Sequence, residues 1–307
     1  MWKVLSGAFL GWSLGANDSA NVFGTGVLTG LIKYRTAILL TAFFVLCGAL
    51  IEGQKGMETV EELSLLLPLD AFYCALAAAL TISFLTYLSL PASTSQAIIG
   101  AVTAAGLLSG TADFLMLYKI VLCWVLTPVG GIIFSFVIYK ALSYGIDRTI
   151  TSITGRNYFY ALGIVVAGCY GAYSLGGNNV ANVTAVYVGA GVLSTKQALW
   201  IGGASIAAGV LTYSKKVMVT IGKSIAPLDP FSALVTVLAE AFTLHLFTQV
   251  GVPVSSSQAI VGAVVGVGLV RDSRTLSTSM LIKIALGWLF TPLIACLLTI
   301  LFLHFIG

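Results

Sequence analysis

Charged side chains are scarce in this chain. Asp, Glu, Lys and Arg make up 8% of its 307 residues, whereas apolar residues make up 58%. A soluble domain carries about 25% charged residues, so this composition excludes a protein whose whole surface faces water. Alternating barrel-type strands are also missing, while apolar runs of helix-spanning length, about 20 residues, recur. The sequence therefore predicts an all-α polytopic membrane protein.

Cysteine pairs, basic stripes and catalytic motifs are absent too. The five cysteines lie in apolar segments without Cys-x-x-Cys spacing, which favours core packing over metal binding or disulfides. The net charge of +4 is spread over loops, so we expect no nucleic-acid partner. No Gly-x-Ser-x-Gly element and no serine–lysine pair at a plausible depth is present, which argues against an intramembrane hydrolase. We expect neither an enzyme nor a bound cofactor.

Ten apolar segments follow one another, five in each half of the chain. They lie at about 4–31, 36–54, 69–90, 93–112, 114–144, 158–193, 197–213, 231–252, 255–270 and 280–306. The first segment has the length of a signal anchor. Its motif recurs deep in the chain, however, where no signal peptide belongs, so we expect it to remain in the mature protein.

The second half repeats the first. Residues 13–22 read Ser-Leu-Gly-Ala-Asn-Asp-Ser-Ala-Asn-Val, and residues 174–183 read Ser-Leu-Gly-Gly-Asn-Asn-Val-Ala-Asn-Val. Residues 91–100 and 253–262 share the pattern Pro-x-Ser-x-Ser-Gln-Ala-Ile-x-Gly. A Trp-x-x-Thr-Pro element also occurs in both halves. Duplicated polar breaks at matching positions in two apolar halves indicate the central site of a transporter.

The repeats are predicted to have opposite orientations in the membrane. They comprise residues 1–150 and 151–307, joined near 145–157, and together form one transport unit. Five crossings per repeat are an odd number, so the second repeat enters upside down. If all ten segments cross, one side receives 11 of the 15 basic residues: Lys33, Arg35, Lys140, Arg148, Arg156, Lys215, Lys216, Lys223, Arg271, Arg274 and Lys283. This positive-inside bias places both termini outside the cell.

One segment is short for a full crossing. Sixteen residues at 255–270 rise about 24 Å, against a hydrocarbon core of about 30 Å. If 93–112 and 255–270 instead returned to the side that they entered from, the basic residues would divide 8 to 7 and the bias would vanish. We therefore expect ten crossings, with partial re-entry of these two segments as the alternative.

Asp18 lies in the middle of a long apolar segment, flanked by glycine and asparagine. A carboxylate at this depth costs at least about 2.5 kcal/mol unless something neutralises it. Glycine and asparagine favour a local break in the helix, and the freed carbonyls would complete an all-oxygen site for a small cation. A polar contact between membrane helices is the alternative interpretation. The candidate cation ligands are Asn17, Asp18, Asn21, Asn178, Asn179 and Asn182.

The Pro-x-Ser elements predict helix starts, because proline ends the preceding run and Ser or Thr supplies the N-cap. A helix N-terminus binds anions through its free N–H groups and its partial positive charge. Hydroxyl groups would bind an oxyanion without a strong fixed charge, so the anion could be released again, as transport requires. Ordinary capping is the alternative. The candidate anion ligands are Ser93, Thr94, Ser95, Gln96, Ser255, Ser256, Ser257 and Gln258.

Two further acids lie within apolar segments and are possible coupling acids. Glu240 is in the middle of its segment, and Glu52 is near the end of the second one. Because Glu52 is close to Lys55, a structural ion pair is the favoured interpretation there. His245 is five residues from Glu240 and therefore off its helical face, so we interpret it as a packed or interfacial residue.

These motifs resemble those of the inorganic phosphate transporter (PiT) family of cation-coupled phosphate symporters. The family signature is Gly-Ala-Asn-Asp-x-Ala-Asn in each half, together with a Pro-x-Ser-Thr-Thr/Ser element. Residues 15–21 match the signature fully, residues 176–182 match with changes, and the resemblance covers nearly the whole chain. It implies an inverted-repeat fold with broken or short helices at the site, phosphate at the hydroxyl motifs and sodium or protons at the Asn-Asp motifs. It also implies a homodimer.

The chain departs from the family pattern at four positions. Asn179 stands where aspartate is usual and Gly177 where alanine is usual, while Gln96 and Gln258 replace a frequent histidine. The long hydrophilic central loop of larger members is missing. The lost carboxylate weakens one cation site, which puts the coupling stoichiometry in question.

We therefore expect sodium-coupled phosphate symport across the plasma membrane. Sodium is the only metal ion expected. It is preferred over protons because the motifs offer neutral oxygens rather than a chain of titratable groups. Proton coupling and a sulfate permease of the same fold are the alternatives within transport. A passive anion channel is the alternative from another class.

Overall fold

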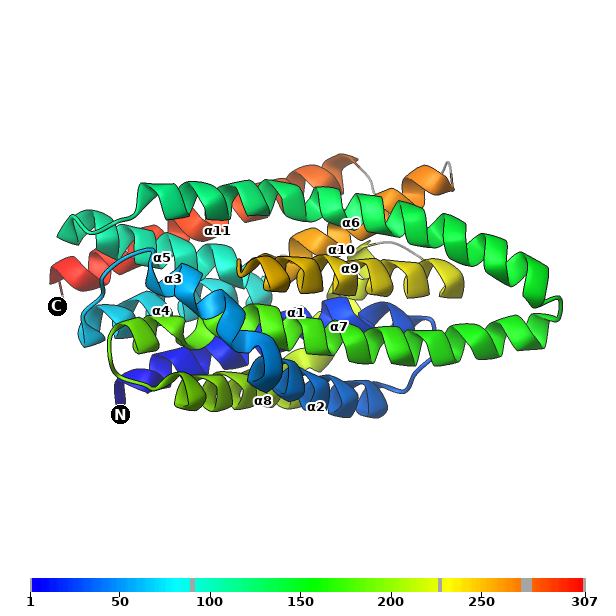
Figure 1. Ribbon diagram of the computed structural model, residues 1–307, viewed down its shortest axis with the longest axis horizontal. Helices are drawn as coiled ribbons and strands as arrows, with labels where there is room; N and C mark the ends of the chain where they lie inside the picture. The colour runs from blue at the N-terminus through cyan, green and yellow to red at the C-terminus, as the bar shows by residue number, and fades with distance from the viewer. Residues whose placement is uncertain (1, 89–91, 226–227, 272–277, 306–307) are drawn as a thin grey trace.

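The computed structural model describes residues 2–88, 92–225, 228–271 and 278–305, and every regular element in these ranges is a helix (Figure 1). The elements are η1 (Trp2–Val4), α1 (Leu5–Leu28), α2 (Tyr34–Glu52), η2 (Gly53–Gly56), α3 (Met57–Glu61), α4 (Pro68–Tyr87), α5 (Thr94–Ser109), α6 (Phe114–Thr149), α7 (Ile153–Gly189), α8 (Thr195–Ile225), α9 (Pro230–Val250), α10 (Ser256–Val270) and α11 (Thr278–Phe305).

Each of the ten predicted segments corresponds to one helix of 15 residues or more, and the chain is an integral membrane protein. Six helical stretches in the described residues are long and apolar enough to cross a membrane: 34–61, 68–87, 114–149, 153–189, 230–250 and 281–305. The predicted linker at 145–157 is mostly helical, because α6 continues to Thr149 and α7 begins at Ile153. Only residues 150–152 separate the two helices.

The two short helices belong to hairpins that turn back inside the molecule. α4 and α5 both have one end at the side where the termini lie, and α9 and α10 both have one end at the opposite side (Figure 1). Gly251 ends α9 with φ +77°, a conformation that glycine adopts at little cost, and Ser255 caps α10. The turns of both hairpins lie against the middles of α1 and α7, as the contacts described below show.

The expectation of ten full crossings is therefore wrong for these two pairs. α5 and α10 are 16 and 15 residues long, too short to cross. A hairpin returns the chain to the side that it entered from, as two full crossings would. Every other connection is therefore on the same side of the membrane as in the arrangement with ten crossings. Both termini lie at one end of the molecule (Figure 1). The α1–α2 connection, which carries Lys33, and the α6–α7 connection, which Arg148 and Arg156 flank, lie at the other end (Figure 1). Arg274 is outside the described residues.

Helices of one half pack on helices of the other in matched pairs. α1 packs on α8 as α2 packs on α7, and α6 packs on α10 as α11 packs on α5. The contacts are close enough to require glycine: a Cβ on Gly15 would overlap the carbonyl oxygen of Ile206, and one on Gly176 would overlap that of Val45. Gly100 and Gly262 face the carbonyls of Pro292 and Pro128 in the same way. These matched contacts fit two halves of opposite orientation.

The helix break expected at the Asn-Asp motifs is not formed. α1 runs without interruption through Asp18, and α7 runs through Asn179. The glycines that suggested a break serve instead as close-approach points between membrane helices, a common use of small residues in lipid. Backbone carbonyls in both motifs remain in helical hydrogen bonds, so side chains must supply the oxygens of a cation site.

Candidate functional site

The site centres on Asp18, which is 2% exposed in the middle of α1. Its Oδ2 accepts a hydrogen bond of 2.8 Å from Ser256 Oγ at the start of α10. Asn21, one turn further along α1, donates from Nδ2 to the same hydroxyl at 3.2 Å. Ser256 therefore connects the carboxylate in the first half to a helix N-terminus in the second.

The first asparagine of each motif hydrogen-bonds to the last turn of the first helix in a hairpin. Asn17 Nδ2 donates to Thr86 Oγ1 near the end of α4 at 2.7 Å, and Asn178 Nδ2 donates to Thr248 Oγ1 near the end of α9 at 3.1 Å. The backbone N–H of Val254 donates to Asn178 Oδ1 at 2.9 Å. Thr86 and Thr248 each stand five residues before the proline of their motif, and this matched spacing is the sequence signal that could have identified them.

In the second motif, the side chains of Asn179 and Asn182 hydrogen-bond within their own helix. Asn179 Nδ2 donates to the carbonyl of Leu175 at 3.2 Å, and Asn179 Oδ1 accepts from Asn182 Nδ2 at 3.0 Å. Asp18 accepts from a hydroxyl of α10, but among the described residues Asn179 makes no equivalent contact to α5, and Thr94 Oγ1 is buried there without a partner. The two halves therefore differ in chemistry as well as in charge.

The hydroxyl motifs form helix N-caps, as the sequence predicts. Ser93 Oγ accepts from the backbone N–H of Gln96, and Ser255 Oγ accepts from that of Gln258, both at 3.3 Å. Ser95 and Ser257 hydrogen-bond to these cap hydroxyls at 3.2 and 2.9 Å. All eight candidate anion ligands are buried at the two helix starts. N-capping thus uses one hydroxyl of each motif, that of Ser93 in the first and that of Ser255 in the second.

The two glutamines lie around a common cavity rather than beside Asp18. A cavity of about 460 Å³ is lined by Gln96 and Gln258 together with residues of α6 and α11. Gln96 and Gln258 are each 4% exposed. The starts of α5 and α10 therefore share one cavity, as expected from the inverted repeat. On α10, Ser256 faces Asp18 while Gln258, two residues later, faces this cavity.

Several buried oxygens of the two Asn-Asp motifs and of Glu240 have no hydrogen-bond partner in the described part of the chain. They include Asp18 Oδ1, Asn182 Oδ1 and both carboxylate oxygens of Glu240. Glu240 is fully buried on α9, which packs against α1, and its carboxylate is close enough to interact electrostatically with Asp18. Hard oxygens that accept but cannot donate suit a small cation. Residue chemistry therefore fits a cation at this depth.

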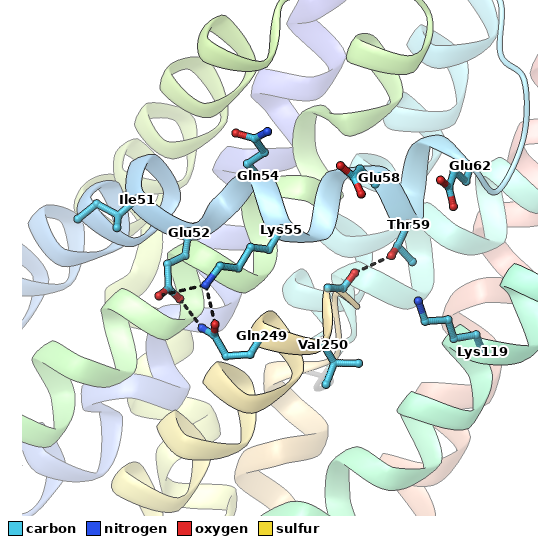
Figure 2. A pocket seen from close by; sticks show the side chains of 11 residues that line it. Ile51, Glu52, Gln54, Lys55, Glu58, Thr59, Glu62, Lys119, Gln249 and Val250 are labelled. Carbon is cyan, nitrogen blue, oxygen red and sulfur yellow. Dashed lines mark hydrogen bonds and ion pairs between the residues drawn. The ribbon is translucent and has the colours of Figure 1, made fainter.

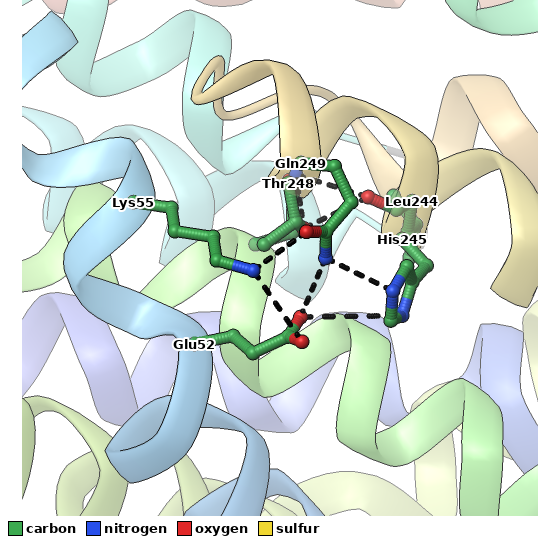
Figure 3. A network of polar contacts seen from close by, with 7 residues as sticks. Glu52, Lys55, Leu244, His245, Thr248 and Gln249 are labelled. Carbon is green, nitrogen blue, oxygen red and sulfur yellow. Dashed lines mark hydrogen bonds and ion pairs between the residues drawn. The ribbon is translucent and has the colours of Figure 1, made fainter.

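Glu52 belongs to a separate network nearer the end of the molecule that carries the termini. Its carboxylate lies 3.6 Å from Lys55 Nζ, accepts from Gln249 Nε2 at 3.0 Å and lies 4.0 Å from His245 Nδ1 (Figure 3). Lys55 also donates to Gln249 Oε1 at 2.6 Å. The structural ion pair expected for Glu52 is thus present, and His245 stacks against Tyr173.

This network borders a cavity of about 620 Å³ (Figure 2). Figure 2 shows Lys55 and Lys119 on different elements of its wall, with Glu58 and Glu62 along α3 and just after it. Thr59 Oγ1 donates to the carbonyl of Gly251 at 2.6 Å, so the segment of η2 and α3 contacts the turn of the α9–α10 hairpin. The cavity is therefore lined by polar and charged side chains beside that turn.

Comparison with known proteins identifies the family. The sequence pattern of the phosphate transporter family matches residues 14–299. The chain belongs to the phosphate transporter family. A protein of Methanocaldococcus jannaschii that is named as a phosphate permease is 29% identical over 96% of this chain and 94% of its own length. The sulfate permease CysP of Bacillus subtilis is 28% identical over 95% of this chain and 84% of its own length.

The fold also agrees with that of a solved protein. A structure titled "The sodium-dependent phosphate transporter" superposes with a TM-score of 0.83, at 23% identity, over 97% of this chain and 96% of that one. At this identity the likeness establishes the fold. The phosphate transporter family therefore accounts for the helical membrane architecture, and the family and fold are those of transporters rather than enzymes.

Proposed function

We propose that this chain is a symporter that moves inorganic phosphate across the plasma membrane together with sodium ions. Membership of the phosphate transporter family and the fold shared with a sodium-dependent phosphate transporter support this proposal. The first turns of α5 and α10 both contribute a residue, Gln96 and Gln258, to one cavity. Helix N-termini favour anions, which supports an oxyanion site near these two helix starts.

The observation that carries the proposal is the hydrogen bond between Ser256 and Asp18. A cation bound at Asp18 changes the charge that Ser256 faces, and Ser256 belongs to the first turn of the helix whose Gln258 lines the anion cavity. Cation and anion therefore act on the same short helix, which is what coupled transport requires. The residues proposed to bind the cation are Asn17, Asp18, Asn21, Asn178, Asn179 and Asn182. Glu240 is proposed as an additional acid.

Sodium is proposed over protons because, apart from Glu240, the polar groups beside Asp18 are amides and hydroxyls that do not titrate. Proton transfer needs a sequence of groups that can gain and lose a proton, whereas sodium needs only oxygens at a suitable distance. Uptake of phosphate into proteoliposomes, with and without an inward sodium gradient at fixed pH, tests this assignment. Uptake that follows a pH gradient and ignores sodium would assign proton coupling instead.

Sulfate is the second candidate substrate, because a sulfate permease is among the relatives at 28% identity. Hydroxyls and helix N-termini bind either oxyanion. Phosphate changes its protonation near neutral pH and sulfate does not, so uptake of each anion at pH 6 and pH 8 distinguishes the two. Flux that does not saturate and does not depend on a counter-ion would identify a passive anion channel.

We further propose a homodimer in the lipid bilayer with both termini outside the cell. The dimer rests on the family resemblance, and the orientation rests on the basic residues gathered at the end opposite the termini.

A further inference from the structure

A groove beside the last turns of α6 carries two basic side chains, those of Lys140 and Arg148. It has a volume of about 550 Å³, and its wall consists of residues of α6 between Tyr139 and Arg148 together with Val270 at the end of α10. The last turns of α6 and the first turns of α7 extend beyond the neighbouring helices at the end of the molecule opposite the termini (Figure 1). The groove therefore lies toward that end.

The placement of charge along α6 sets the groove at the membrane surface. Lys119 and Lys140 flank residues 120–139, which carry no charged side chain. These 20 residues rise about 30 Å, which is the thickness of the hydrocarbon core. Lys140 therefore lies among the lipid headgroups of one leaflet, and the rest of α6 extends toward water. In the proposed orientation this is the cytoplasmic leaflet, which contains anionic lipids.

The acidic residue of the groove does not neutralise its two cations. Asp147 forms an ion pair of 2.9 Å with Arg156 at the start of α7, and it also accepts from Ser143 Oγ at 3.3 Å. Lys140 and Arg148 form no ion pair in the part of the chain that the structure describes. The groove therefore has a net positive charge.

Aromatic rings hold both cations in place. Phe136, Lys140, Tyr144 and Arg148 follow one another at intervals of four residues, so they lie along one side of α6. Lys140 Nζ is 4.6 Å from the centre of the Phe136 ring, and Arg148 Cζ is 3.9 Å from the centre of the Tyr144 ring. A contact of this kind positions a cation without cancelling its charge. Both groups can therefore still bind an anion.

The surface of α6 on the membrane side of the groove is apolar. Ile133 and Val137, one and two turns before Lys140, are 55% and 56% exposed. A free anion would gain nothing from this surface. A phospholipid would place its phosphate at the basic residues and its acyl chains along Ile133 and Val137, so the surroundings of the groove fit a lipid.

We propose that this groove binds the headgroup of an anionic phospholipid, with Lys140 and Arg148 donating to its phosphate and the acyl chains lying along α6. A zwitterionic headgroup fits less well, because it would bring a cation of its own close to these two. Basic pockets between membrane helices at the cytoplasmic surface bind anionic headgroups in this way. The inference uses the proposed orientation to choose the leaflet and does not depend on which ion is transported.

Direct lipid binding tests the inference. The probe is phosphatidylglycerol with a dye on one acyl chain, and its binding to the purified full chain in neutral detergent is followed by fluorescence anisotropy. We expect Lys140→Gln and Arg148→Gln each to weaken binding about fivefold, and the double variant about 25-fold, the effect of removing basic residues near an anionic lipid. Phosphatidylcholine with the same dye should bind the wild type about as weakly as phosphatidylglycerol binds the double variant.

A double variant of Lys33 and Arg35 is the matched control. Both residues are exposed, and Lys33 is in the α1–α2 connection at the same end of the molecule (Figure 1). Replacing both by glutamine changes the net charge by the same amount outside the groove. Its affinity for phosphatidylglycerol should stay within about twofold of wild type, because isolated exposed charges contribute little.

Three results would overturn the inference. The first is an affinity of the Lys140 and Arg148 double variant equal to that of wild type. The second is an equal loss in the Lys33 and Arg35 double variant, which would mean that only net charge matters. The third is displacement of the lipid by inorganic phosphate as readily as by unlabelled phosphatidylglycerol, which would assign the groove to a free anion. The readout is lipid binding, so its result is independent of the uptake experiments that test the proposed function.

Discussion

Ser256 donates a hydrogen bond of 2.8 Å to Asp18, although 238 residues separate them in the chain. The same hydroxyl accepts from Asn21. It therefore orients the carboxylate, while Asp18 Oδ1 has no partner in the part of the chain that the structure describes. A cation at Oδ1 would alter the strength of this hydrogen bond and, through it, the position of the start of α10.

Replacement of Asp18 by asparagine should weaken sodium activation far more than phosphate binding. Asp18→Asn keeps the shape and the acceptor for Ser256 but removes the charge that holds the cation. We expect the sodium concentration for half-maximal uptake to rise at least tenfold, measured in proteoliposomes. Asn179→Asp is the matched variant and should strengthen sodium dependence. Unaltered sodium activation in Asp18→Asn would exclude Asp18 from the cation site.

Glu240 should contribute to cation binding without contacting phosphate. Its two oxygens are buried, have no partner among the described residues and interact electrostatically with Asp18, so Glu240→Gln removes an ionisable group at the same depth. We expect a lower Hill coefficient for sodium activation and a phosphate KM within twofold of wild type. Glu52→Gln is the comparison, because Glu52 already pairs with Lys55. A loss of phosphate affinity with normal sodium cooperativity would contradict this role.

Ser256 and Thr94 occupy equivalent positions but should respond differently to removal of the hydroxyl. Ser256→Ala breaks contacts to Asp18 and Asn21, whereas Thr94→Ala removes a hydroxyl with no partner among the described residues. We expect Ser256→Ala to raise the apparent constants for both sodium and phosphate, and Thr94→Ala to raise that for phosphate alone. Uptake at varied concentrations of each ion measures both constants. Identical behaviour of the two variants would argue against the asymmetry.

Gly15 should tolerate no side chain. A Cβ at this position would overlap the carbonyl oxygen of Ile206 on α8, and backbone cannot move aside as a flexible side chain can. We expect Gly15→Ala to destabilise the protein by about 1–3 kcal/mol, visible as a lower midpoint of thermal unfolding in detergent. Gly24→Ala on the same helix is the control, because its nearest neighbour would be Met218 Cγ at an ordinary 3.5 Å. Equal midpoints for both variants would show that α1 and α8 are less closely packed.

Accessibility from outside tests the orientation. Single cysteines at 55–68 should react with an impermeant thiol reagent added to intact cells, and those at 145–157 or 214–230 should not. The background would have the five native cysteines replaced, since all are free. Labelling at both 55–68 and 145–157 would give the first half an even number of crossings, and the inverted arrangement would then be wrong.

The sequence predicted the helices and the polar motifs well because hydrophobicity and repetition act locally. The segment predicted at 36–54 is the helix at 34–52, and the hydroxyl motifs cap helices as expected. The break at Asp18 was predicted wrongly, because glycine has two uses in membrane helices. Only the approach of α8 to Gly15 shows that packing is the one used here.

Partners distant in the chain were the harder part. The length of α10 allowed re-entry, but the contacts of Thr248 and Val254 with Asn178 were needed to place the hairpin turn at the middle of α7. The separation of Gln258 from Ser256 also depends on which neighbours the first turn of α10 meets. No pattern within a single segment contains that information.

The exchange of helix partners between halves has a consequence for how the protein is made. α1 is synthesised long before α8 and α10. When α1 enters the membrane, Asp18 therefore lacks the hydroxyl of Ser256, and the glycine face of α1 lacks the helix that later packs on it. The first half cannot reach its final packing while the ribosome is still producing the second. Folding of the central site is therefore a late event, completed only after the last hairpin has been inserted.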